Sequence, residues 1–372
     1  MNILHIFSST FYAGSVAYAL ALSERQIADN HTVFIISDSE ILPTKALCSA
    51  IPVTNRKHLQ RFKNITFIRK FINNNKIDVV HAHSRAASWL SYFSVLGKKI
   101  PLISTIHGRQ HMHASTSLYD IYGDRIIAVC PNLFTHLVNE VKMKPHKISV
   151  IANGFDSAEI DKFLISDPFK LFLKAKENTM TIAFIGRFNG LKGDIFAEIL
   201  EKIFPKILDN YPTIKIQLIG GEYEVFPEKG KKAVIKLNEK HPNSVEVIGF
   251  VKNLQDYIAK ANLVIGAGRV AIEALYMNTD LLALGEASVI GLIDEKNIQL
   301  AIDTNFGDIL PVHNTNYHDL NVFENELIKF LESYSKEPKK NINTISMILK
   351  KHFDLEKNYQ ELMQIYKDEI SK

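Results

Sequence analysis

The sequence has few cysteines and no long apolar run, and each shortage excludes a class of protein. Its 372 residues include two cysteines, Cys48 and Cys130, which cannot build a disulfide framework and fit a reducing compartment. Charged residues interrupt each apolar stretch before it reaches the roughly 20 residues that a membrane-spanning helix needs. The net charge of +4 is small, so the composition does not indicate a nucleic-acid-binding protein.

The N-terminal residues also lack the basic region and the small-residue cleavage site of a secretory signal peptide, so we expect a cytoplasmic protein. Acidic residues are missing from the segment 55–76, which carries seven Lys or Arg residues with apolar residues between them. A helix of this composition either packs its apolar stripe on the core or lies on the anionic inner face of the cell membrane. The sequence leaves both alternatives open, and nothing else in it supports contact with RNA.

Short apolar runs alternate with amphipathic stretches, which is typical of parallel sheets with crossover helices. The chain is too long for one ordinary core, and the alternation restarts near residue 180. We therefore predict an α/β protein with two doubly wound, Rossmann-like domains. The expected strands are 1–7, 32–37, 76–83, 101–107, 125–130 and 148–154, then 180–187, 214–221, 244–250, 263–268 and 281–285, and the expected helices include 14–28, 84–97, 194–212 and 355–370.

The less periodic stretch 155–179 marks the boundary between the two domains. We place the N-terminal domain at 1–160 and the C-terminal domain at 161–354, and the stretch between them is a candidate hinge. Ligands of open α/β sheets bind beyond the carboxyl ends of the strands. We therefore expect a site in the cleft between the two domains, formed by loops that follow strands.

The segment 261–288 has the form of a dinucleotide-binding fingerprint, with a glycine turn, a helix and then Glu286, twenty residues after Gly266. That fingerprint normally follows the first strand of its domain. Here the corresponding first strand is followed by Arg187 and Lys192 instead. A nucleotide diphosphate accounts for both loops, whereas a dinucleotide accounts for one, so a dehydrogenase is the weaker interpretation.

Three loops of the C-terminal half suit a nucleotide diphosphate. In "GRFNGLKG" the cations of Arg187 and Lys192 follow a strand, where they can bind phosphate oxygens. The pair Gly220-Gly221 permits close approach of a ligand to the backbone. The turn before Val270 begins a helix whose free N–H groups favour a phosphate, and Glu273 lies one turn further on.

These stretches resemble a known family. "GRFNGLKG" is similar to the G-R-x-x-x-x-K-G loop of the retaining glycosyltransferases of family 4, also called glycosyl transferases group 1, which have the two-domain GT-B fold. "GRVAIEALYMN" is similar to the later segment of that family that contains a Glu-Ala pair. "DVVHAHS", "ISTIHG" and "ISVIANGFD" resemble family stretches of the N-terminal half.

The resemblance implies a role for each matching position. Glu273 would hold the ribose, and His107 would be the catalytic residue beside the transferred sugar. No bound metal or cofactor is needed, and the final helix, 355–372, would cross back onto the N-terminal domain. The remaining implied positions are those of the donor diphosphate (Arg187, Lys192, Gly14, Gly268, Arg269 and Val270) and of the nucleobase (Gly221, Phe250 and Val251).

The implied function is transfer of a hexosyl or N-acetylhexosaminyl group from a nucleotide-diphosphate sugar, with UDP favoured, to an acceptor hydroxyl. By analogy, the acceptor is a glycan or a lipid-linked molecule in the synthesis of a bacterial envelope glycan, lipopolysaccharide or glycolipid. Two alternatives stay open: a nucleotide-sugar epimerase with the same fold, and a catalytically weak partner subunit that binds sugar nucleotides.

Two positions depart from the family pattern. Ile265 occupies a position, eight residues before Glu273, where the family usually has a glutamate that helps to hold the donor sugar. The first loop has Ala13-Gly14 where the family has two glycines.

The histidines also allow a rival interpretation. His81 and His83 lie two residues apart on one strand and therefore face the same side. With His107, His111 and His113 they could form a zinc site.

Overall fold

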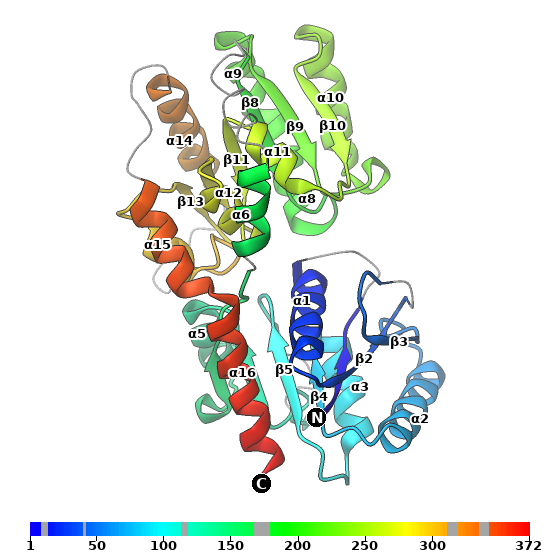
Figure 1. Ribbon diagram of the computed structural model, residues 1–372. Coiled ribbons are helices and arrows are strands. Elements are labelled where there is room, and N and C mark those ends of the chain that lie inside the picture. Colours follow the sequence, from blue (N-terminus) through cyan, green and yellow to red (C-terminus); the bar gives the residue numbers. More distant parts are fainter. Residues whose placement is uncertain are drawn as a thin grey trace. The chain divides into compact units, whose positions relative to one another are not determined.

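The computed structural model describes residues 1–8, 14–39, 42–112, 118–155, 157–166, 179–310, 319–334 and 342–372 (Figure 1). The chain divides into two compact units, one of residues 1–155 with 353–372 and the other of residues 156–352. The division thus lies a few residues from the boundaries at 160 and 354 that the sequence suggested. None of the described helices is long and apolar enough to span a bilayer.

The N-terminal unit is built on a parallel sheet. The strand order is β3-β2-β1-β4-β5-β6-β7, and every neighbouring pair is parallel. The central strands are apolar and buried because helices cover both faces of the sheet. The strands are β1 (Asn2–Ile6), β2 (Thr32–Ser37), β3 (Leu47–Ala50), β4 (Val79–Ala82), β5 (Leu102–Ile106), β6 (Arg125–Ala128) and β7 (Ile148–Val150).

Helices on the two faces bury different parts of this sheet. Ile68 of α2 and Leu90 of α3 pack with one set of strand residues, whereas Tyr18 of α1 packs with another set that includes Tyr366 of α16. The C-terminal helix α16 therefore completes the core of the N-terminal unit (Figure 1). The helices are α1 (Gly14–Ala28), α2 (His58–Asn74), α3 (Arg85–Val95), α5 (Pro131–Asn139), the 3-10 turn η1 (Pro145–Lys147) and α16 (Leu355–Ile370).

The C-terminal unit repeats the architecture with one difference. Its strand order is β10-β9-β8-β11-β12-β13, and β13 is antiparallel to β12. Phe184 of β8 contacts Phe196, Phe204 and Phe323, at the centre of this core. The strands are β8 (Thr181–Ile185), β9 (Lys215–Ile219), β10 (Val245–Gly249), β11 (Leu263–Gly266), β12 (Asp280–Leu284) and β13 (Val289–Leu292).

Helices again cover both faces of this second sheet. They are α6 (Ser157–Ser166), α8 (Gly190–Lys202), α9 (Phe204–Asn210), η2 (Tyr223–Val225), α10 (Glu228–Lys240), α11 (Leu254–Lys260), α12 (Arg269–Tyr276), α13 (Ile298–Asp303), α14 (Leu320–Ser333) and α15 (Ile342–Phe353).

Three sequence predictions about elements are wrong in part. The predicted single helix 194–212 is two helices that break at Ile203, because Pro205 can occupy only the first turn of α9. The edge strands β3 and β13 have no counterpart among the predicted strands. The start of the predicted hinge is the helix α6, in which Asp161 accepts a hydrogen bond from Tyr276 of α12 at 3.0 Å.

Candidate active site

Arg187 and Lys192 lie in the loop and first helical turn that follow β8. Lys192 is buried, whereas the side chain of Arg187 is half exposed. The loop between them bends back so that Phe188 packs against Gly193, the residue after Lys192. A Cβ on Gly193 would lie 1.9 Å from the carbonyl oxygen of Phe188, so this bend requires glycine. The glycines of "GRFNGLKG" therefore allow the loop to fold tightly and place both cations at the carboxyl edge of the sheet.

Two carboxylates, which the sequence did not predict as a pair, hold these cations. Glu286, after β12, forms an ion pair with Arg187, and Asp308 accepts a hydrogen bond from Lys192 Nζ at 3.0 Å. The same oxygen of Asp308 accepts the N–H of Glu286 at 3.0 Å, which joins the two pairs into one network. Glu286, the acid of the apparent dinucleotide fingerprint, is thus bound to a cation of another loop.

The turn after β11 meets the same network. Gly268 has φ of +59°, a conformation that favours glycine, and it precedes α12 without a side-chain cap. A Cβ on Gly268 would lie 3.4 Å from Oδ2 of Asp308. The loops after β8, β11 and β12 therefore converge, and the N-terminus of α12 adds a partial positive charge.

Glu273 lies one turn into α12 and is 3% exposed. Its carboxylate accepts a hydrogen bond from Nε of Arg269 at 2.6 Å, and this pair fixes the direction of the buried carboxylate. Val270, in the first turn of α12, is half-buried. Ile265 is fully buried in β11, so no polar group replaces the family glutamate at this position.

The positions implied for the nucleobase lie on two adjacent loops. Gly220 donates its N–H to the carbonyl of Gly249 at 2.8 Å, which holds the ends of β9 and β10 together. A Cβ on Gly221 would lie 2.8 Å from Cβ of Phe188, so this glycine allows the loops to pack. Phe250 is 49% exposed and Val251 is half-buried.

In the N-terminal unit, His107 follows β5 beside three other histidines. Its ring stacks on that of His83 with 5.9 Å between centroids, and His83 also stacks on His5 and contacts His81. Burial lowers the pKa of His5 and of His107 to about 4, and it lowers the pKa of His81 and of His83 well below the usual value. The four rings are therefore neutral at pH 7.

The structure changes the set of histidines that could bind a zinc ion. His111 is exposed, and His113 lies outside the described residues. In the described part of the chain, the histidines that could hold a metal ion are His5, His81 and His83, whose ligand atoms lie within 4.8 Å of one another.

The first loop of the N-terminal unit is described only in part. Gly14 is exposed at the start of α1, where a Cβ would meet nothing within 4 Å, and Ala13 lies outside the described residues.

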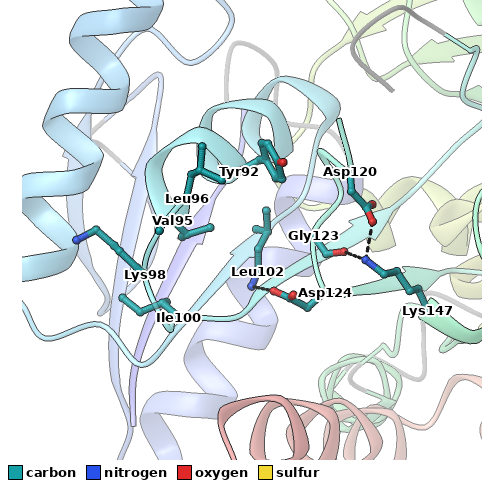
Figure 2. Close-up of a pocket in the computed structure, with 11 residues that line it drawn as sticks. Tyr92, Val95, Leu96, Lys98, Ile100, Leu102, Asp120, Gly123, Asp124 and Lys147 are labelled. Atoms are coloured by element: carbon teal, nitrogen blue, oxygen red, sulfur yellow. Dashed lines mark hydrogen bonds and ion pairs between the residues drawn. The ribbon is translucent and has the colours of Figure 1, made fainter. Parts of the chain in front are cut away.

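A separate pocket of about 210 Å³ opens at the other end of the N-terminal sheet (Figure 2). Figure 2 shows Lys147 bound to Asp120 and to the carbonyl of Gly123, and Asp124 bound to the N–H of Leu102. Leu102 is the first residue of β5, and the others precede β6 and β7, so the pocket lies at the amino ends of the strands. Because ligands of such sheets bind at the carboxyl ends, we assign it no part in the site.

Comparison with protein families finds a match in the N-terminal half of the chain. Residues 12–159 match the model of Glycosyltransferase Family 4. Comparison with curated protein sequences gives no match. The resemblance that the sequence motifs suggested is thus confirmed over most of the N-terminal unit.

Solved structures match the whole chain. A glycosyltransferase from Rickettsia africae is 17% identical, with a TM-score of 0.73 over 99% of this chain and 98% of its own. HepE from Anabaena, in complex with UDP and glucose, is 14% identical, with a TM-score of 0.69 over 99% and 100% of the two chains. The lipopolysaccharide outer core galactosyltransferase WaaB is 13% identical, with a TM-score of 0.59 over 97% and 98%. The predicted GT-B fold, with two Rossmann-like sheets, is confirmed.

Proposed function

We propose that this chain is a retaining glycosyltransferase that moves a sugar from a nucleotide-diphosphate sugar, with UDP favoured, to an acceptor hydroxyl. The observation that carries the proposal is the network of Arg187, Lys192, Glu286 and Asp308 beside the N-terminus of α12. HepE, which shares the fold, binds UDP and glucose. A diphosphate is the ligand that two cations and a helix N-terminus suit best.

In this proposal the network stabilises the leaving diphosphate. Negative charge develops on the diphosphate as its bond to the sugar breaks, and fixed positive groups lower the energy of that state. Glu286 and Asp308 keep the two cations in place before the donor arrives. When the donor binds, each cation exchanges a carboxylate oxygen for a phosphate oxygen. The two cations supply the positive charge, so the step needs no metal ion.

The other positions complete the donor site. Glu273 accepts hydrogen bonds from the ribose hydroxyls, and its pairing with Arg269 holds its carboxylate in a fixed orientation for this task. The nucleobase of the donor packs against Phe250 and Val251. His107 contacts the transferred sugar, which is a hexosyl or an N-acetylhexosaminyl group.

We also propose an envelope glycan or lipid-linked acceptor, approached from the membrane surface. WaaB, which shares the fold, is a lipopolysaccharide galactosyltransferase. In α2 the residues Ile68 and Ile72 are buried in the core, whereas Leu59 and Phe62 are each 69% exposed among the basic residues. The helix therefore combines both alternatives: one stripe packs on the core, and a second basic and apolar face suits an anionic membrane.

Ile265 favours a second candidate, a subunit that binds sugar nucleotides with little catalysis. Its side chain is fully buried, so a donor sugar gains no carboxylate contact from this position. Such a subunit would bind UDP-sugars and would release no UDP with any acceptor.

Ligand-dependent unfolding tests the proposal. The protein is heated with UDP, GDP and their sugars, with and without a chelator, and UDP release is then measured across an acceptor panel. A ligand at 100 times its Kd should add about 2.7 kcal/mol to the free energy of unfolding. A transferase gives a glycoside of retained configuration, and an epimerase changes the sugar of the donor without an acceptor. Absence of stabilisation by any nucleotide diphosphate would exclude the function.

A further inference from the structure

Three buried polar atoms at the carboxyl edge of the N-terminal sheet have no hydrogen-bond partner among the described residues. They are Nδ1 of His83, Nε2 of His107 and Oδ1 of Asn153. His83 follows β4, His107 follows β5 and Asn153 follows β7. The rings of His83 and His107 stack, and Asn153 is bonded to His107, so the three atoms belong to one cluster. Buried polar groups are normally paired, so an unpaired group of this kind indicates a ligand.

The hydrogen bonds around His83 determine what its free nitrogen can do. Gln26 turns its Oε1 to Nε2 of His5 at 2.7 Å, while its amide nitrogen points to the sulfur of Met363. Since Oε1 only accepts, Nε2 of neutral His5 carries the proton and Nδ1 of His5 is an acceptor. His83 Nε2 lies 2.9 Å from that acceptor and must donate to it. The free Nδ1 of neutral His83 is therefore a hydrogen-bond acceptor.

The same reasoning assigns the other two atoms. The amide nitrogen of Asn153 lies 3.2 Å from Nδ1 of His107 and donates to it. Nε2 of neutral His107 therefore carries the proton and is a free donor. The amide oxygen of Asn153 is a free acceptor. The cluster thus offers one donor and two acceptors, all uncharged, and His107 and Asn153 are its partly exposed members.

We infer that His83, His107 and Asn153 bind hydroxyl groups of a carbohydrate, with His83 and Asn153 as specificity-determining residues. One hydroxyl donates to His83 Nδ1 and accepts from His107 Nε2, and a second hydroxyl donates to Asn153 Oδ1. A carbohydrate supplies such neighbouring groups, each of which both donates and accepts. The inference rests on the proposed function, and it adds the residues that recognise the sugar.

A metal ion suits the histidines less well. Both nitrogens of His81 already have partners, Tyr366 at 2.6 Å and Thr105 at 2.7 Å. No carboxylate is among the potential ligands that the described residues place there, so a buried dication would be uncompensated.

Two substitutions at His83 separate the free nitrogen from the rest of the ring. The side chain of Gln ends near the position of Nε2, so His83→Gln keeps the bond to His5 and loses the acceptor at Nδ1. The side chain of Asn ends near Nδ1, so His83→Asn keeps that acceptor. The matched control is His81→Gln, which alters the same stack at a residue without a free atom.

The experiment measures the affinity of each variant for UDP and for UDP-glucose, and KM for the acceptor. We expect His83→Gln and Asn153→Ala to bind UDP as wild type does. If the hydroxyl belongs to the donor, the affinity for UDP-glucose relative to UDP should fall about fivefold to tenfold. If it belongs to the acceptor, KM for the acceptor should rise by the same factor. His83→Asn should recover most of the loss. Equal behaviour of His83→Gln, His83→Asn and His81→Gln would overturn the inference while leaving UDP binding, and so the proposed function, intact.

Imidazole ¹⁵N NMR gives a readout that is independent of turnover. In wild type, His83 should show the tautomer protonated at Nε2, and its Nδ1 resonance should move on addition of UDP-glucose or free glucose, galactose or N-acetylglucosamine. If UDP does not bind, the proposed function fails, and the response to free sugars still decides the inference. The opposite tautomer at His83 would contradict it. Cobalt(II) absorption bands that disappear in His5→Gln would also contradict it, because the rings would then be metal ligands.

Discussion

The carboxyl edges of the two sheets carry opposite chemistry on the same architecture. The edge of the C-terminal unit is charged: Arg187, Lys192 and Arg269 are each paired with a carboxylate. The edge of the N-terminal unit presents four neutral histidine rings, and its free polar atoms are uncharged. A charged edge suits a diphosphate and a neutral polar edge suits hydroxyl groups, so under the proposed function we expect the two units to bind different parts of the substrates.

Acid should affect the N-terminal unit most strongly, because its histidines are buried without charge. The unfolded chain binds these protons near pH 6.5, whereas His5 and His107 in the folded chain bind them near pH 4. Stability is therefore complete above about pH 6.5 and falls as the pH falls towards 4. At pH 5 each such histidine should cost about 2 kcal/mol.

Hydrogen exchange against pH measures this effect in each unit. Amides of β4 should lose protection at a higher pH than amides of β8, and His81→Gln should flatten the dependence. Simultaneous loss of protection in both units would show that the histidines do not decide acid stability.

Loss of a cation from the charged edge should have the next largest effect. Lys192→Met removes a fixed positive charge that we propose stabilises the leaving diphosphate. The value of kcat/KM should therefore fall on the order of 10²–10³-fold. Asp308 loses its partner at the same time. The double variant Lys192→Met with Asp308→Asn should therefore regain stability without regaining activity.

Lys206 supplies the control for this substitution. It is 67% exposed and forms a surface pair with Glu324, so Lys206→Met should leave kcat/KM within about twofold of wild type. Similar losses of activity in both lysine variants would argue against a phosphate contact at Lys192.

A smaller effect is expected at Glu273, the residue that we propose binds the ribose. Glu273→Gln should weaken UDP about tenfold and reduce the preference for UDP over 2′-deoxy-UDP, because a hydrogen bond to a charged acceptor becomes a neutral one. Calorimetric titration measures both affinities. Glu198→Gln, which breaks a surface pair with Lys202 of the same spacing, should change neither. If Glu273→Gln keeps the full preference for UDP over 2′-deoxy-UDP, Glu273 does not bind the ribose.

The smallest expected effect is on membrane binding, and it compares α2 of the N-terminal unit with α10 of the C-terminal unit. Lys63 lies on the exposed face of α2, and Lys236 lies on the exposed face of α10. Lys63→Gln should weaken binding to vesicles with anionic lipid about fivefold at low salt, since each lysine near such a surface contributes about 1 kcal/mol. Co-sedimentation measures the difference. Equal effects of Lys63→Gln and Lys236→Gln would indicate general charge attraction rather than contact through α2.

Most elements of the fold could be predicted because their signals are local. The helix α1 and the strand β2 have the predicted bounds, since a buried strand and a one-sided helix impose their own periodicity. The edge strands β3 and β13 could not be predicted. Both strands are only four residues long and partly exposed, so each gives a weak local signal.

The candidate site could be predicted only in part. The loop of Arg187 and Lys192 and the turn at Gly268 have glycine patterns that local geometry explains. Asp308 has no such pattern, although the left-handed residues Asn305 and Phe306 precede it. His5, in the middle of an apolar strand, gave no sign that it would meet His83.

The sequence by itself determined two Rossmann-like sheets and the loops that carry the cations, because both follow from the spacing of neighbouring residues. Only the tertiary structure decided which charges meet: Glu286 is 99 residues from Arg187, and Asp308 is 116 residues from Lys192. It also decided the protonation of the histidines, since Gln26 orders the ring of His5 and through it that of His83. Charge pairing and tautomer choice depend on distances of a few ångströms between remote segments, which only the packing of the sheets and helices sets.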